Sequence, residues 1–255
     1  MKNPLQVTGA HSAGKALFLL RHVAAHHPQG LRLTDLIELS GLDRSTTHRL
    51  LACLIEEGFV DRALPSKLYR LGIEAMQFGL ASSSMVPLIE RFRPVMQSLA
   101  QLSGDTVFLV VRSGDHALCL HREEGSYPIK AFVIQPGTRR PLGMSSVGVG
   151  ILARFAETDV DATYSRLRPD YRRAGISLDK LRGLIHETRK LGFSQMTDLN
   201  VDTKGVGCAV RLSSNGYAGV SIAAINSRMP AQRRRELGGV LAESLRPFEW
   251  TEHRR

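Results

Sequence analysis

The sequence lacks long hydrophobic runs, a signal peptide and any low-complexity tract or internal repeat. No apolar stretch among its 255 residues approaches the roughly 18 residues that a membrane-spanning helix needs. The N-terminus has no signal-peptide core, because Pro4, Gly9, His11 and Lys15 interrupt it. The three cysteines are odd in number and widely spaced, which favours reduced thiols. We therefore expect a cytoplasmic protein with no membrane contact.

Clear signatures of metal binding and catalysis are also missing. No His or Cys group has the spacing of metal ligands, so we expect no metal and no cofactor. Cys208, His121 and Asp105 could form a nucleophile–base–carboxylate set, but nothing in their spacing requires one. The string GVGILA (148–153) matches a dinucleotide-binding pattern, but the residues before it do not form the required strand. A cytoplasmic enzyme, or a small-molecule-binding protein with a pocket in its C-terminal half, therefore remains only the alternative.

Positive charge is the most conspicuous feature of the composition. The formal net charge is +10 at pH 7, in a chain that is 43% hydrophobic and 23% charged, as in ordinary globular proteins. Residues 1–72 carry +3, residues 73–134 carry −1 and residues 135–255 carry +8. This surplus is compatible with DNA binding, but it does not locate a site.

Residues 12–72 have the pattern of three helices followed by a hairpin, after a loose segment at 1–11. Ser12 can cap a first helix, Thr34 can cap a short helix DLIELS ending at Gly41, and Asp43 can cap a third that runs to Gly58. FVDRALPSKLYRLG (59–72) predicts two strands about a Pro-Ser turn. The apolar face of the first helix is predicted to consist of Ala13, Ala16, Leu17, Leu20 and Val23 or Ala24.

The third helix is predicted to have one buried and one polar face. Thr47, Leu50, Leu51 and Leu54 fall on one side of the helical wheel, and Ser45, Arg49, Ala52 and Glu56 on the other. Helix, tight turn, helix and basic hairpin in this order predict a winged helix-turn-helix whose third helix enters the major groove. The plainer alternative is an amphipathic helix with a solvated polar face. The candidate DNA contacts are Arg44, Ser45, Thr46, Thr47, His48 and Arg49 from the helix, with Arg62, Lys67 and Arg70 from the hairpin.

The remainder of the chain predicts a helical connector and an α+β domain. Residues 73–102 are largely helical, with interruptions at Pro87 and Pro94. In residues 103–255, strands are expected at TVFLVVR, ALCLHR, KAFVIQ, VGCAVRL and YAGVSIAAI, and helices at about 145–157, 159–167, 178–191 and 230–245. Hairpins with separate helices favour an antiparallel sheet with flanking helices. A DNA binder without a sensing role would not need these roughly 150 additional residues, which favours a sensor domain.

Several strings resemble the IclR family of bacterial transcriptional regulators. They are SAGKALFLLRHVA, LTDLIELSGLDRSTTHRLLACLIEEGFVDR and LYRLG, followed by GTRRPL and GVGCAV, so the likeness covers almost the whole chain. The resemblance implies a winged helix-turn-helix, a linker helix and a GAF-like effector domain. It also implies homodimers paired through their DNA-binding domains, often assembled as dimers of dimers. The domains are then expected at 12–72 (DNA binding), 73–102 (linker helix) and 103–255 (effector binding).

The resemblance also places an effector pocket. In the family, Pro-Leu followed by small residues opens a helix at the pocket rim, which here is RRPLGMSSVGVGILA (139–153); an acidic turn and a strand follow at 197–212. Gly143 stands where the family commonly has His, and Arg211 where Pro is common. The alternatives are that the small residues only allow close helix–sheet packing, and that Cys208 is an inert buried thiol. The candidate effector residues are Leu142, Gly143, Met144, Ser145, Ser146, Asp198, Asp202, Cys208 and Ser221.

We therefore expect a ligand-responsive, sequence-specific DNA-binding protein. The expected partners are a pseudo-palindromic double-stranded operator and a small-molecule effector, possibly a carboxylate, because the helix near Ser145 would offer free N–H groups and hydroxyls to an anion. The expected role is repression of a catabolic operon for a small organic or aromatic acid.

Overall fold

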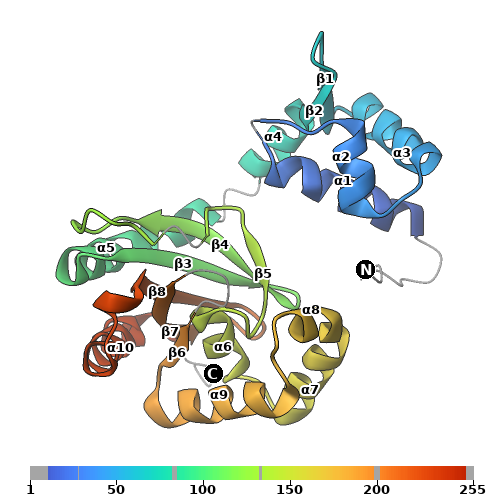
Figure 1. The fold of residues 1–255 in the computed structure, drawn as a ribbon. Coiled ribbons are helices and arrows are strands. Elements are labelled where there is room, and N and C mark those ends of the chain that lie inside the picture. Colours follow the sequence, from blue (N-terminus) through green and yellow to red (C-terminus); the bar gives the residue numbers. More distant parts are fainter. Residues whose placement is uncertain (1–10, 28, 82–84, 132–133, 198–201, 251–255) are drawn as a thin grey trace, which may run out of the picture. The chain divides into compact units, whose positions relative to one another are not determined.

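The protein consists of two compact units, Met1–Val86 and Pro87–Arg255. The structure is a computed structural model, and it describes residues 11–27, 29–81, 85–131, 134–197 and 202–250 (Figure 1). A helical unit precedes a unit with an antiparallel sheet and helices, so the α+β prediction is confirmed. Within the described ranges, no helix has both the length and the apolar character needed to cross a bilayer.

The N-terminal unit contains four helices and a two-stranded hairpin among its described residues. They are α1 (His11–Ala25), α2 (Leu33–Ser40), α3 (Arg44–Glu56), β1 (Val60–Ala63), β2 (Leu68–Leu71) and α4 (Ile73–Ala81). β1 and β2 pair antiparallel, from Val60 opposite Leu71 to Ala63 opposite Leu68. The predicted order of helix, helix, helix and hairpin is therefore present.

The starts of α2 and α3 depend on acidic side chains. Asp43 caps α3 as predicted, since its Oδ1 accepts a hydrogen bond from the Thr46 amide at 2.8 Å. This bond lowers the pKa of the Asp43 carboxyl, so the cap is charged at neutral pH and is lost as the pH falls through that lowered value. The prediction for α2 was wrong: the helix already begins at Leu33, and the Asp35 carboxylate accepts from the Arg32 amide at 2.8 Å. Thr34 therefore lies inside the helix.

The core of this unit differs from prediction in α1. Leu19 and Val23 are fully buried, and Ala16 and Leu20 pack beside them, whereas Leu17 is 51% exposed. The buried stripe thus follows positions i, i+3, i+4 and i+7 from Ala16. The predicted apolar face included Ala13 and Leu17, which are exposed. These residues also recur at helical spacing, so the sequence alone does not show which of the two stripes is buried.

The C-terminal unit is built on a six-stranded, fully antiparallel sheet of order β5-β4-β3-β8-β7-β6. Its strands are β3 (Thr106–Ser113), β4 (His116–Glu123), β5 (Arg139–Pro141), β6 (Ser194–Thr197), β7 (Thr203–Arg211) and β8 (Tyr217–Ile225). Its helices are α5 (Met85–Ser103), α6 (Ser146–Leu152), α7 (Glu157–Arg166), α8 (Arg168–Arg173), α9 (Leu178–Leu191) and α10 (Ala231–Leu245), with 3-10 turns η1 (Asn226–Arg228) and η2 (Arg246–Phe248).

Helices cover both faces of this sheet, and each face has its own core (Figure 1). Phe92 and Met96 of α5 and Leu241 of α10 pack on one face. The other face is covered by α6, α7, α8 and α9. α6 packs very closely on β7. A Cβ atom added at Gly207 of β7 would lie only 2.7 Å from the Val147 amide nitrogen of α6, so only glycine fits there. The closeness of α6 to the sheet places its first residues at one end of the strands, where a pocket is found.

Two strands and one α-helix of the described C-terminal residues were not predicted, and one predicted strand is not seen. β5, β6 and α8 are short, with three, four and six residues. KAFVIQ was expected to be a strand, but residues 130, 131, 134 and 135 have no regular structure, and 132–133 lie outside the described residues. Pro94 does not interrupt α5, since it lies inside the helix.

Candidate nucleic-acid interface and ligand pocket

α3 presents a polar surface on an apolar base. Leu50, Leu51 and Leu54 are buried in the core of the N-terminal unit. On the opposite side of the same helix, the exposed residues are Arg44, Ser45, His48, Arg49, Ala52, Cys53 and Glu56. The predicted division into two faces is therefore confirmed. Donor side chains are concentrated in the first turns of the helix, and Glu56 is at its end.

Thr47 must be removed from the candidate DNA contacts. It is fully buried, and its hydroxyl donates to the Asp43 carbonyl at 2.9 Å. The helical wheel of the third helix already placed Thr47 beside the leucines. Its neighbours in the sequence are hydrogen-bond donors, and this made Thr47 look like a DNA contact. Thr46 is half-buried and its amide is bound to Asp43.

The two exposed arginines of α3 are not held by carboxylates. Among the described residues, neither Arg44 nor Arg49 forms an ion pair or a side-chain hydrogen bond. Their guanidinium groups are thus available for an outside acceptor, and a guanidinium matches the paired acceptors of a guanine edge or a phosphate.

The hairpin offers two exposed cations and one that is partly engaged. Arg62 is exposed, with its guanidinium carbon 5.5 Å from the centre of the Tyr69 ring. Lys67 is exposed at the turn. Arg70 is half-buried, and its Nη2 donates to the Gln29 carbonyl at 3.5 Å. Arg62 and Lys67 are therefore better placed than Arg70 to contact a phosphate backbone.

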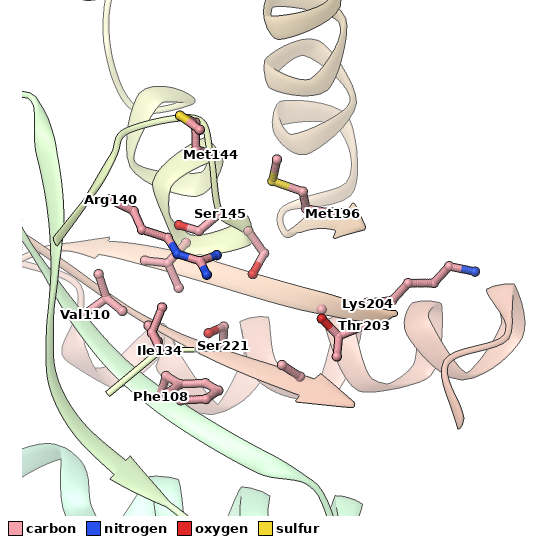
Figure 2. A pocket seen from close by; sticks show the side chains of 14 residues that line it. Phe108, Val110, Ile134, Arg140, Met144, Ser145, Met196, Thr203, Lys204 and Ser221 are labelled. Carbon is pink, nitrogen blue, oxygen red and sulfur yellow. The ribbon is translucent and has the colours of Figure 1, made fainter. Parts of the chain in front are cut away.

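A small pocket, partly open to solvent, lies on the α6 side of the sheet (Figure 2). Helix α6, the turn before it and strands β3, β5, β7 and β8 contribute most of its wall. Its lining residues are Phe108, Val110, Ile134, Arg140, Met144, Ser145, Ser146, Val147, Met196, Thr203, Lys204, Gly205, Ser221 and Ala223.

Four of the candidate effector residues are brought together here. Met144, Ser145, Ser146 and Ser221 all line the pocket. Ser145 also caps α6, since its Oγ accepts from the Gly148 amide at 3.1 Å. A hydroxyl that accepts this bond still has its proton to donate. The predicted pocket rim is therefore formed by the start of α6.

Four other candidates do not line the pocket. Leu142 is fully buried behind it, and its carbonyl accepts a hydrogen bond from the Tyr171 hydroxyl. Gly143 is buried against the side chains of Leu152, Leu181 and Tyr171. Asp202 is exposed and accepts from the side chain of Asn226.

Cys208 is the fourth candidate effector residue that does not line the pocket. Strand alternation places it on the opposite face of the sheet, in the core formed with α5 and α10. Its Sγ lies 3.6 Å from the Gly192 carbonyl oxygen, and burial raises the pKa of the thiol to about 11. It is therefore a neutral buried thiol. Asp198 lies outside the described residues.

Sequence reasoning missed most of the pocket wall, including Phe108, Arg140, Met196 and Thr203. β3 is buried on both faces and therefore gives a continuous apolar run, from which the face of Phe108 cannot be read. Arg140 and Met196 lie on strands too short to show a period. One signal was usable: side chains along a strand point alternately to its two faces. In β7 this alternation places Thr203 and Gly205 on one face of the sheet and Cys208 on the other.

The catalytic set considered from the sequence is not assembled. Asp105 is ion-paired with Arg228 and Arg233, at 2.8 Å each. His121 Nε2 lies 2.8 Å from Glu123 Oε1, and the Cys208 thiol faces Gly192. Each member thus has another partner. Within the described ranges, no three His, Cys, Asp or Glu residues are grouped as a metal site.

Two family models match the chain, one for each unit of the fold. Residues 12–63 match the IclR helix-turn-helix domain, and residues 81–247 match the C-terminal domain of bacterial transcriptional regulators of the IclR type. The chain is 27% identical over 249 residues to the HTH-type transcriptional regulator BhcR of Paracoccus denitrificans, covering 95% of this chain and 87% of that protein. It is 26% identical over 249 residues to the transcriptional repressor IclR of Escherichia coli, covering 92% and 87%. These relatives are named as regulators.

A solved structure shares the fold. It is an IclR homologue from Microbacterium hydrocarbonoxydans complexed with 4-hydroxybenzoate, with a TM-score of 0.66 and 16% identity, covering 91% of this chain and 98% of that one. At this identity the likeness concerns the fold alone.

Proposed function

Because the chain belongs to the IclR family of bacterial transcriptional regulators, we propose that it is a ligand-responsive repressor of a catabolic operon. The observation that carries the proposal is the surface of α3, where Arg44, Ser45, His48 and Arg49 stand exposed above buried leucines. The repressor role is supported by the relative named as one in Escherichia coli. Residues 12–72 would be the DNA-binding domain, 73–102 the linker and 103–255 the effector domain.

The proposed DNA contacts follow from the geometry of the helix. The first turns of a recognition helix meet base edges in the major groove, while side chains around them bind phosphate. Arg49 would bind a guanine edge with both arms of its guanidinium, and Ser45 would bind phosphate near the positive end of the helix dipole. Arg62 and Lys67 of the hairpin would contact the backbone.

Assembly as a homodimer, and then as a dimer of dimers, is part of the same proposal. Apolar side chains of α4 are exposed in the N-terminal unit, at Ile73, Met76, Phe78 and Leu80. Pairing two copies through such a surface would bury it and present two copies of α3. A two-fold dimer reads a pseudo-palindrome whose half-sites lie about one DNA turn, or a multiple, apart.

The proposed effector is a small organic or aromatic acid bound in the pocket beside α6. The wall combines apolar side chains with the hydroxyls of Ser145, Ser146 and Ser221, which suits a small ligand with a polar end. The relative crystallised with 4-hydroxybenzoate supports this choice. To release DNA, the ligand must bind one arrangement of the dimer more tightly than the other.

Footprinting on the DNA upstream of the neighbouring genes tests the DNA-binding part of the proposal. We expect protection of an inverted repeat, with protected half-sites on one face of the duplex. Protection that is absent at every neighbouring promoter, or that shows no two-fold repeat, would count against a dimeric operator reader.

Replacing Lys67 by alanine should weaken binding to all DNA sequences by a similar factor. Lys67 is exposed at the turn of the hairpin, so it is placed to meet phosphate and not bases. Loss of one phosphate contact lowers the slope of log affinity against log salt by about 1. Fluorescence anisotropy with operator and random duplexes, at several salt concentrations, measures both effects. A loss confined to the operator would show that Lys67 reads sequence.

A further inference from the structure

Three hydroxyl groups in the wall of the pocket beside α6 are buried without a hydrogen-bond partner. They belong to Ser146, Thr203 and Ser221, which line the pocket and are only 8%, 5% and 8% exposed. Within the described part of the chain, none of these three hydroxyls takes part in a hydrogen bond. Buried polar groups in native proteins nearly always have a partner, so three unpaired hydroxyls around one pocket indicate that a bound molecule pairs with them.

The close packing of α6 on β7 brings Ser146 near Ser221. A Cβ atom added at Gly207 would lie 3.0 Å from Ser146 Cβ, and one added at Gly205 would lie 3.4 Å from Ser146 Oγ. Ser146 therefore stands directly over these two glycines. Ser221 of β8 is the register partner of Gly207, and such partners have their Cβ positions about 5 Å apart on one face of the sheet. One ligand group between the two serines can thus reach both hydroxyls.

The third hydroxyl is at the other end of the pocket. Thr203 precedes Gly207 by four residues on β7, so it lies about 13 Å along the strand from the level of Ser221. Figure 2 shows Thr203 and Ser221 on the strands, with Met144 and Ser145 across the pocket at the start of α6. A group bound by both serines is therefore too far away to be shared with Thr203.

A pair of serine hydroxyls is better matched to a hydroxyl than to a carboxylate. Each serine can donate one hydrogen bond and accept others, and a ligand hydroxyl can accept from one serine while it donates to the other. A carboxylate only accepts, and burying its charge beside neutral groups is costly. Phe108 is the register partner of Ser221 on β3 and adds apolar surface beside the pair. This end of the pocket thus suits a neutral hydroxyl on an otherwise apolar body.

We propose that Ser146 and Ser221 bind a hydroxyl group of the ligand and make the pocket selective for hydroxylated acids. This inference rests on the proposed function, and it adds the group that is recognised and the two side chains that recognise it. A site that hydrogen-bonds a ligand hydroxyl rejects the analogue without it, because the buried polar groups of the site are then left unpaired. The apolar part of the ligand contacts Phe108 and Met196.

The test compares hydroxylated acids with analogues that lack the hydroxyl. The pairs are 4-hydroxybenzoate with 4-fluorobenzoate and 6-hydroxyhexanoate with hexanoate. Each compound is titrated calorimetrically into the full-length wild type, Ser146→Ala, Ser221→Ala and the control Ser98→Ala, which changes an exposed serine of α5. The wild type and the control should prefer the hydroxylated member of at least one pair. Each pocket variant should bind that member about three- to tenfold more weakly, the usual effect of losing one neutral hydrogen bond, and bind its analogue within about twofold of the wild type.

The outcomes separate this inference from the function on which it rests. An unchanged preference in either pocket variant overturns the shared role of the two serines and leaves the acid effector in place. Equal weakening of both members of a pair also overturns it, because a damaged pocket would lose both. A preference that is lost in Thr203→Val but kept in the serine variants would place the hydroxyl at the other end and overturn it as well.

Two results in the wild type are also decisive. Equal affinity for both members of each pair contradicts the selectivity and leaves an acid-binding pocket in place. If the wild type binds no compound in the panel, the selectivity and the proposed acid effector are both contradicted. DNA binding by α3 is unaffected by any of these results.

Discussion

Replacing Leu51 by alanine is expected to destabilise the N-terminal unit by about 2–5 kcal/mol, the cost of emptying a well-packed leucine site. Leu51 is only 1% exposed and belongs to the core that includes Leu19, Val23 and Leu36. It lies on the buried face of α3. Losing it removes the contacts that hold α3 in place, so binding to operator and to random DNA should fall together.

Denaturant unfolding followed by a probe in each unit measures this effect. The core of the N-terminal unit is separate from the two cores of the C-terminal unit, so the transition of the C-terminal unit should stay where it is in the wild type. Leu64→Ala is the matched control, because Leu64 is 80% exposed and its truncation should leave both transitions in place. Similar small shifts in Leu51→Ala and Leu64→Ala would contradict the assignment of Leu51 to the core.

Replacing Asp105 by alanine is expected to destabilise the C-terminal unit by about 3–5 kcal/mol, as is usual when one partner of a buried ion pair is removed. The Asp105 side chain is 2% exposed, and its two oxygens bind Arg228 and Arg233 at 2.8 Å. Both arginines also donate to the carbonyl of Ser103, the last residue of α5. The carboxylate therefore joins the residue before β3 to η1 and α10, whose arginines also hold the end of α5. Its loss leaves two guanidinium groups without their counter-charge.

An exposed pair of the same type provides the control. Arg182 donates to both oxygens of Asp161 at 2.9 and 2.7 Å, but these side chains are solvent-exposed. Screening by water makes such pairs nearly neutral, so Asp161→Ala should not shift unfolding measurably. Equal effects of Asp105→Ala and Asp161→Ala in the same unfolding experiment would show that the buried pair does not stabilise the unit.

Local rules were sufficient to predict the order of the helices and the hairpin in the N-terminal unit. The cap at Asp43, the glycine after α2 and the leucine spacing of α3 act within a few residues, so the sequence displays them directly. Predictions failed where the local sequence allowed two equally good choices of buried face or of capping residue. In α1, Leu17 and Leu19 both fit a helical stripe, and only packing against the other helices decides that Leu19 is buried. The Thr34 cap failed in the same way, because Asp35 competes for the same helix start.

The ligand pocket was harder to predict, because it is assembled from distant strands. Ser145 and Ser146 were found because they open a helix, which is a local signal. Cys208 was misplaced because one step along β7 changes the face of the sheet. Arg140 was missed because β5 is a three-residue edge strand, and its pairing with β4 cannot be read from so short a pattern.

The most direct test of sequence reading by α3 is the affinity of Arg49→Ala for the operator and for a random duplex of equal length, at the same salt concentration. Arg49 is exposed in the first turns of α3, with no carboxylate partner among the described residues. We expect operator binding to weaken by about 1–3 kcal/mol, with relaxed preference at one base pair, and random binding to change little. Equal weakening on both duplexes would make Arg49 a phosphate contact and contradict its role in reading bases.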